Sequence, residues 1–175
     1  MLFQAAVFLH VVSVIGLFIA FGCEWLVISQ VKRADNVAVA RSWVGATKSL
    51  PGLAIGSLIV ILLTGIYLAM VTQLFQTWWL RISFLVFILL GPAGAIAGRR
   101  LRELRSGKDA ATDVAWFTGL ANNGALQAAL KLQLTMTLAI VFMMTARPGL
   151  IGSVVWSVGS VVVGLLWNAM SGGKS

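Results

Sequence analysis

The sequence predicts an all-α integral membrane protein, a bundle of five transmembrane helices. Of its 175 residues, 59% are hydrophobic and only 10% are charged, whereas soluble domains carry about 25% charged residues. Five apolar runs are each long enough to cross a hydrocarbon core, which takes about 20 helical residues. The basic residues lie mainly between these runs. This composition excludes a water-soluble fold and intrinsic disorder, because the polar residues that would cover a surface are missing.

The five runs follow one another along the chain with short breaks. They predict helices over residues 2–29, 50–72, 78–98, 126–146 and 150–170. Pro51 suits the first turn of the second helix, and Lys131, early in the fourth, can extend its amine towards the membrane surface. The first run is too long for a signal peptide and has no basic start, so we expect an uncleaved span.

The distribution of positive charge predicts the orientation. Of the 13 Lys and Arg residues, only Arg81 and Arg147 fall outside the connectors 30–49 and 99–125, the start of the fourth helix and the tail. Because basic residues accumulate on the cytoplasmic side, we expect the N-terminus outside and the C-terminus in the cytoplasm. An odd number of spans agrees with termini on opposite sides.

The cytoplasmic loop 99–125 is the only sizeable stretch outside the apolar runs of a single transmembrane domain, 1–175. Residues 99–108 are expected to continue the third helix until Ser106-Gly107 ends it. Thr112 or Asp113 is a candidate N-cap for a short helix. Its apolar residues are Val114, Trp116, Phe117 and Leu120. We expect this helix to lie along the cytoplasmic membrane interface.

Several classes of site are excluded by what the chain lacks. The net charge of +8 is explained by topology, so no nucleic-acid partner is expected. One histidine and one cysteine, Cys23, rule out a zinc or iron–sulfur cluster site with the usual ligand spacing. Common hydrolase and nucleotide-binding motifs are missing, and no catalytic pair is predicted.

Small and polar residues form one stripe along the fifth helix. They recur three or four positions apart and are Gly149, Ser153, Ser157, Ser160, Gly164, Asn168 and Ser171. Such a stripe is typical of close helix–helix packing in membranes. The alternative is a polar path through the membrane, lined by Ser153, Ser157, Ser160 and Asn168. Serine does not decide between them, because its hydroxyl can bond to its own helix.

Two ionisable residues lie within the first run, where such groups are costly and often functional. Glu24 is near the cytoplasmic end, at the level of Lys32, Arg99 and Arg100, and is interpreted as an intramembrane ion pair or a proton site. His10 is expected to bond Tyr67 or a Ser or Thr of a neighbouring span. Alternatively it ligates haem or copper. A haem there would be five-coordinate, take Met70, Met136, Met143 or Met144 as its second ligand, or lie between two copies of the chain.

The start of the first helix resembles a group of small bacterial membrane proteins. Residues 8–12 read Phe-Leu-His-Val-Val and residues 15–17 read Ile-Gly-Leu. This pattern is similar to the opening helix of the DUF2269 proteins, the CopD copper-resistance domain and the HemJ-type protoporphyrinogen oxidases. In the HemJ type this histidine is associated with haem. The resemblance therefore implies haem or metal binding by His10. The chain differs in having no Trp before Gly16.

These observations leave three functional hypotheses for a multipass protein of a bacterial-type cytoplasmic membrane. The first is a small membrane protein that binds haem or a metal ion through His10. The second is an oligomeric transporter or channel whose path is lined by the serine stripe. The third is an accessory subunit that docks into a larger membrane complex. Besides the lipid bilayer, the expected partners are further copies of the chain or that complex.

Overall fold

The computed structural model describes residues 1–107 and 112–172, and side chains as far as Met170. All the regular elements of the described chain are helices. They are α1 (Leu2–Lys32), α2 (Val37–Ala46), α3 (Leu50–Val71), the 3₁₀ turn η1 (Leu74–Gln76), α4 (Trp78–Gly107), α5 (Val114–Ala121), α6 (Gly124–Ala146) and α7 (Leu150–Gly172).

The predicted all-α bundle is confirmed, since five helices of the described chain are long and apolar enough to cross a membrane. They are α1, α3, α4, α6 and α7, and they make the chain a multipass membrane protein. The span boundaries agree with the sequence prediction to within about three residues, except at the end of α4. That helix continues beyond its apolar part to Gly107, as residues 99–108 predict.

The two short helices between spans are capped by polar side chains. Asp113 accepts a hydrogen bond from the backbone N–H of Ala115 at the start of α5, at 3.0 Å, so the predicted helix exists and Asp113 is its N-cap. Asn36 caps α2 in the same way through the N–H of Val39. The sequence predicts only a connector over 30–49, and the structure adds α2 within it.

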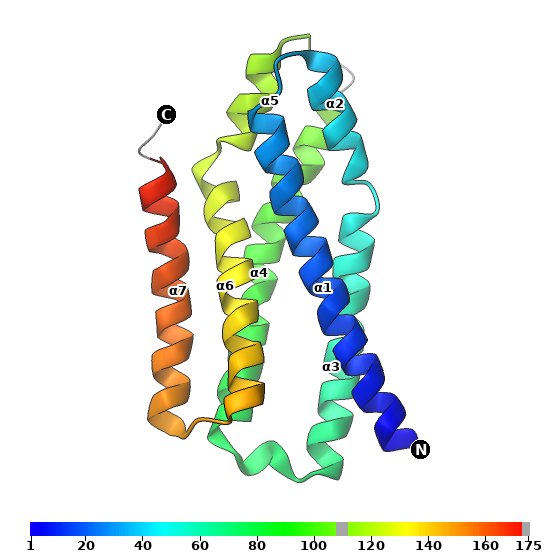
Figure 1. Cartoon of the computed structure of the whole chain (residues 1–175), viewed down its shortest axis with the longest axis vertical. Helices are drawn as coiled ribbons and strands as arrows, with labels where there is room; N and C mark the ends of the chain where they lie inside the picture. The colour runs from blue at the N-terminus through cyan, green and yellow to red at the C-terminus, as the bar shows by residue number, and fades with distance from the viewer. Residues whose placement is uncertain (108–111, 173–175) are drawn as a thin grey trace.

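Figure 1 shows the helices running side by side along one axis, with the start of α1 and the end of α7 at opposite ends of the bundle. The end formed by α2 and α5 also holds the last turn of α7. The other end holds the N-terminus, η1 and the turn between α6 and α7. Helix α1 packs most extensively on α3, and α6 lies against both α4 and α7. The bundle thus consists of an α1–α3 pair and an α4–α6–α7 group.

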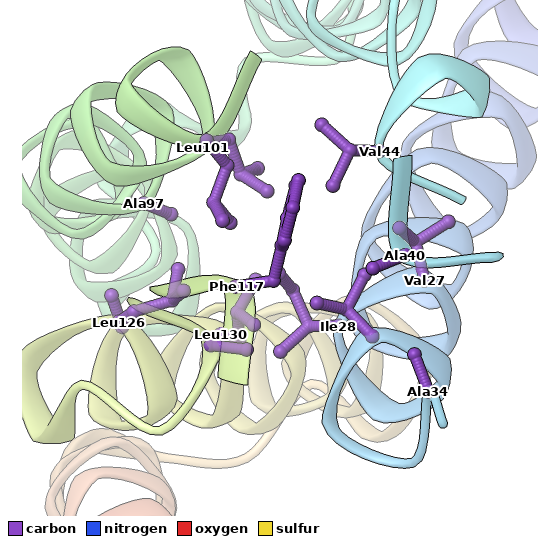
Figure 2. Packing of buried hydrophobic residues seen from close by; sticks show 14 residues of the cluster. Val27, Ile28, Ala34, Ala40, Val44, Ala97, Leu101, Phe117, Leu126 and Leu130 are labelled. Atoms are coloured by element: carbon purple, nitrogen blue, oxygen red, sulfur yellow. The ribbon is translucent and has the colours of Figure 1, made fainter. Parts of the chain in front are cut away.

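The largest apolar core joins these two groups at the α2 and α5 end. Phe117 of α5 is fully buried there among Ile28, Val44, Leu101 and Leu130 (Figure 2). These contacts correct one expectation. The apolar face of α5 points into the protein, because four neighbouring helices enclose Phe117, and is not spread along a membrane interface.

Candidate functional site: an apolar cavity beside His10

A cavity lies between the two helix groups at the end of the bundle opposite Phe117. Its volume is about 210 Å³, and it is partly open to its surroundings. Helices α1 and α3 contribute His10, Ile61, Leu62, Gly65, Ile66 and Ala69; η1, α4 and α6 contribute Phe75, Leu80, Arg81, Ser83, Phe84, Phe87, Ile140 and Met144. Nearly all of this lining is apolar. His10 and Arg81 are its two basic residues.

The imidazole of His10 is held by two groups of α3, the hydroxyl of Thr64 and the backbone carbonyl of Ile61. Its Nδ1 lies 2.9 Å from Oγ1 of Thr64 on α3. The Thr64 hydroxyl has one proton, which it donates to the backbone carbonyl of Val60, one turn earlier. The hydroxyl must therefore accept from His10, so Nδ1 carries the proton and Nε2 of the neutral ring keeps its lone pair.

Nε2 of His10 has no hydrogen-bond partner among the described residues, and this atom is not fully buried. The ring also has little room to move. A Cβ placed at Gly65 would lie 3.3 Å from Cε1 of His10, so the missing side chain at Gly65 makes space for the imidazole. His10 thus presents a fixed acceptor or metal ligand beside an apolar cavity.

Arg81, near the start of α4, brings a positive charge to the same cavity. Its Nε donates to the carbonyl of Phe75 at 2.8 Å, and its guanidinium carbon lies 5.2 Å from the ring centroid of Trp78. These contacts hold the side chain across the turn between α3 and α4. In the described chain its two terminal nitrogens have no hydrogen-bond partner, so they remain available as donors.

The enclosed part of the cavity fits one substituted ring, because about 150 Å³ is enough for a benzene molecule and this space measures about 210 Å³. Of the methionines considered as second ligands, Met144 alone lines the cavity; the Met70 side chain is 64% exposed, whereas Met136 and Met143 are buried in the core between α4 and α6. The described residues contain no cluster of three His, Cys, Asp or Glu that could hold a metal ion.

Glu24 lies in the other half of α1 and belongs to a different environment. Its side chain is buried, and the charge that acts on it is that of Arg105 on α4. No described basic group lies within 4 Å of its carboxylate. Arg105 in turn donates to the carbonyl of Thr47 at 3.2 Å. The sequence predicts Lys32, Arg99 or Arg100 as the partner of Glu24, whereas the structure brings Arg105 to it.

Lys131 and Asn168 link α6 to α7. The Lys131 amine, which is buried, donates to Oδ1 of Asn168 at 3.1 Å and lies 5.9 Å from the ring centroid of Trp167. Trp167 in turn lies near Trp25 of α1, with ring centroids 6.3 Å apart. The predicted extension of Lys131 towards the membrane surface stays a prediction, and the structure adds this contact between α6 and α7.

The serine stripe of α7 faces its neighbour α6 at several positions. The hydroxyls of Ser153, Ser157 and Ser160 each donate to a backbone carbonyl three to five residues earlier in the chain. A Cβ at Gly164 would lie 2.8 Å from Oγ1 of Thr135 on α6. These contacts favour the helix–helix packing interpretation of the stripe.

Several residues around the site were not found from the sequence. Thr64 and Gly65 stand next to each other in the second span, and such a polar and small pair is a signal of close helix contact. Arg81 was counted only as a topology residue. Gln133 is buried on α6, with no partner in the described chain for its Oε1. Its position between Leu132 and Leu134 in a predicted span was a signal too.

Comparison of the chain with protein-family models, with curated proteins and with solved structures finds no match. The likeness of residues 8–17 to the opening helix of the HemJ, CopD and DUF2269 proteins therefore stays a prediction.

Proposed function

We propose that this protein binds a small apolar molecule, taken from the bilayer, in the cavity beside His10. The observation that carries the proposal is the fixed imidazole: Nδ1 is held by Thr64, which leaves the Nε2 lone pair at the edge of an apolar space of about 210 Å³. Apolar pockets with a few convergent polar groups are the usual form of small-molecule sites.

The test is binding of tetramethylbenzene, a single substituted ring, to the protein in lipid nanodiscs, measured by equilibrium dialysis against empty nanodiscs. Ile66 lines the cavity, and Leu63 on the same helix is exposed outside it. Ile66→Trp should fill the space and weaken binding by about tenfold or more, whereas Leu63→Trp should leave it unchanged. Equal binding by both variants would reject the proposal.

A metal ion held by His10 is the second candidate. The observation that favours it is the hydrogen bond from Nδ1 to Thr64, since a metal-ligating histidine commonly donates its other N–H to a fixed acceptor. Met144, which lines the same cavity, offers a thioether suited to a soft ion such as Cu(I). Metal analysis of the purified protein, with His10→Gln as the comparison, tests this candidate.

We also propose that the N-terminus faces the outside and the α2–α5 end faces the cytoplasm of a bacterial-type cell. Arg81 and Arg147 lie at the end that carries the N-terminus, and eight described basic residues of α1 to α4 lie towards the other. These eight are Lys32, Arg33, Arg41, Lys48, Arg99, Arg100, Arg102 and Arg105. The predicted contributions of Lys108 and Lys174 lie outside the described residues.

Cysteine labelling tests this orientation. A cysteine at Ser106, at the end of α4, should resist an impermeant thiol reagent in intact cells and react after lysis. A cysteine at Gln73, in the turn before η1 at the opposite end, should react in intact cells. The reverse pattern would overturn the assignment. The lone natural cysteine, Cys23, is replaced by Ser in both variants.

A further inference from the structure

The two basic residues of the cavity differ in what they offer a ligand. Nε2 of His10 is a hydrogen-bond acceptor while the ring is neutral, because Thr64 already receives the Nδ1 proton. The terminal nitrogens of Arg81 are donors only. His10 comes from α1 and Arg81 from the first turn of α4, so the two groups reach the cavity from different helix groups.

Between these two polar groups the cavity is aromatic and aliphatic. Phe84 and Phe87 lie on α4, and Phe75 belongs to η1. Aromatic side chains favour a flat ring, which they contact by stacked or edge-to-face packing. The volume of about 210 Å³ leaves room for one ring with small substituents. An alkyl chain would fill such a space without using the acceptor on His10.

We infer that the ligand of this cavity is a lipid-soluble aromatic alcohol of the phenol or quinol class. Its hydroxyl donates to Nε2 of His10, an oxygen across the ring accepts from Arg81, and the ring lies among the phenylalanines. This inference rests on the proposed function, because it names the class of apolar molecule that the cavity takes. It concerns binding alone and involves no electron transfer.

The test compares two probes of the same shape. Tetramethylhydroquinone, kept reduced under argon, carries two hydroxyls, and tetramethylbenzene carries none. Binding to the protein in nanodiscs is measured by equilibrium dialysis and corrected with empty nanodiscs, so that partition into lipid cancels. The wild-type protein should bind the hydroquinone about tenfold more tightly than tetramethylbenzene, since two hydrogen bonds are gained.

Substitutions then test which protein group binds each of the two hydroquinone oxygens. His10→Leu and Arg81→Gln should each weaken hydroquinone binding by about fivefold and leave tetramethylbenzene binding unchanged. His10→Gln, whose amide can donate to Thr64 and still accept, should restore part of the loss. Arg147→Gln is the matched control, because Arg147 lies at the same end and contacts Trp79 instead of the cavity.

The outcomes separate the inference from the proposed function. If both probes bind the wild-type protein equally, or if Arg81→Gln or a folded His10→Leu keeps full hydroquinone binding, the inference fails while the proposed function stands. If neither probe binds, both fail. Arg81 is exposed, so Arg81→Gln should fold normally, and it decides the result even if His10→Leu does not fold.

Discussion

Nδ1 of His10 on α1 and Oγ1 of Thr64 on α3 lie 2.9 Å apart, and the Thr64 hydroxyl is itself bonded to Val60. This chain of two hydrogen bonds has one direction, from imidazole to hydroxyl to carbonyl. It joins the two helices of the α1–α3 pair at the edge of the cavity. It also determines which nitrogen of the only histidine can contact a ligand.

The tautomer of His10 can be measured directly. Because the chain has one histidine, nitrogen NMR of protein labelled at histidine gives one pair of ring signals. We expect the form protonated at Nδ1 to dominate at a pH where the ring is neutral. Thr64→Val removes the acceptor and should lower the ratio of the Nδ1-protonated to the Nε2-protonated form by about fivefold. Thr64→Ser keeps a hydroxyl and should preserve this ratio. A dominant Nε2–H form in the wild-type protein would contradict the assignment.

Phe117 should be among the most sensitive positions of the bundle. It is 0% exposed and lies at the centre of the core that joins the two helix groups. Phe117→Ala should lower the free energy of unfolding by about 3–5 kcal/mol, because a large cavity is created. Leu120→Ala, on the same helix and only half-buried, should cost clearly less. Thermal unfolding in detergent makes the comparison, and equal losses would argue against the buried position of Phe117.

The seam between α6 and α7 can be tested with two glycines of α7. A Cβ at Gly164 would meet Oγ1 of Thr135 at 2.8 Å and the backbone Cα of Leu132 at 3.4 Å, whereas a Cβ at Gly159 meets nothing within 4 Å. Gly164→Ala should therefore destabilise the protein by about 1–3 kcal/mol. Gly159→Ala should be neutral or stabilising, since alanine favours helix. The comparison is made by thermal unfolding, and a neutral Gly164→Ala would mean that α7 does not pack closely at this position.

For Gln133 we predict a substitution that does not lower stability. Its Oε1 is buried without a hydrogen-bond partner in the described chain. Replacing it with Met, which has a similar volume and no such oxygen, should leave stability unchanged or raise it by about 1 kcal/mol. Gln127→Met serves as the comparison, because Nε2 of Gln127 donates to the carbonyl of Ala121 at 2.7 Å, and that variant should lose stability. A marked loss for Gln133→Met, again in thermal unfolding, would indicate a partner for Gln133.

The sequence predicted the bundle well because a membrane span is a local property. Length and apolar composition alone determine that α3 or α6 can cross a membrane. Helix α2 was missed because its ten residues are too few for a span and lie inside a connector with four basic residues. Its local signals are the cap at Asn36 and the helical spacing of Ala40 and Val44. The burial of Phe117 depends on four other helices, so no local pattern distinguishes it from an interfacial residue.

The candidate site was predicted only in part, for the same reason. His10 stood out as an isolated ionisable residue in an apolar run. Its partner, Thr64, could be named only as one of several hydroxyl residues, because the register of α1 against α3 is a tertiary property. The cavity itself depends on how the α1–α3 pair is placed against α4 and α6. No short segment of the sequence determines that placement.

The grouping of the helices has a consequence for biogenesis. Ribosomes make the chain from its N-terminus, so α1 and α3 emerge before α4 begins at Trp78. The pair can then form its own contacts in the membrane, including His10 with Thr64 and the close approach of Gly16 to Ser57. His10 is therefore already oriented by α3 when α4 and α6 pack against the pair and complete the cavity. Two separately translated fragments, divided in the turn at Gln73, should therefore reassemble in the same membrane.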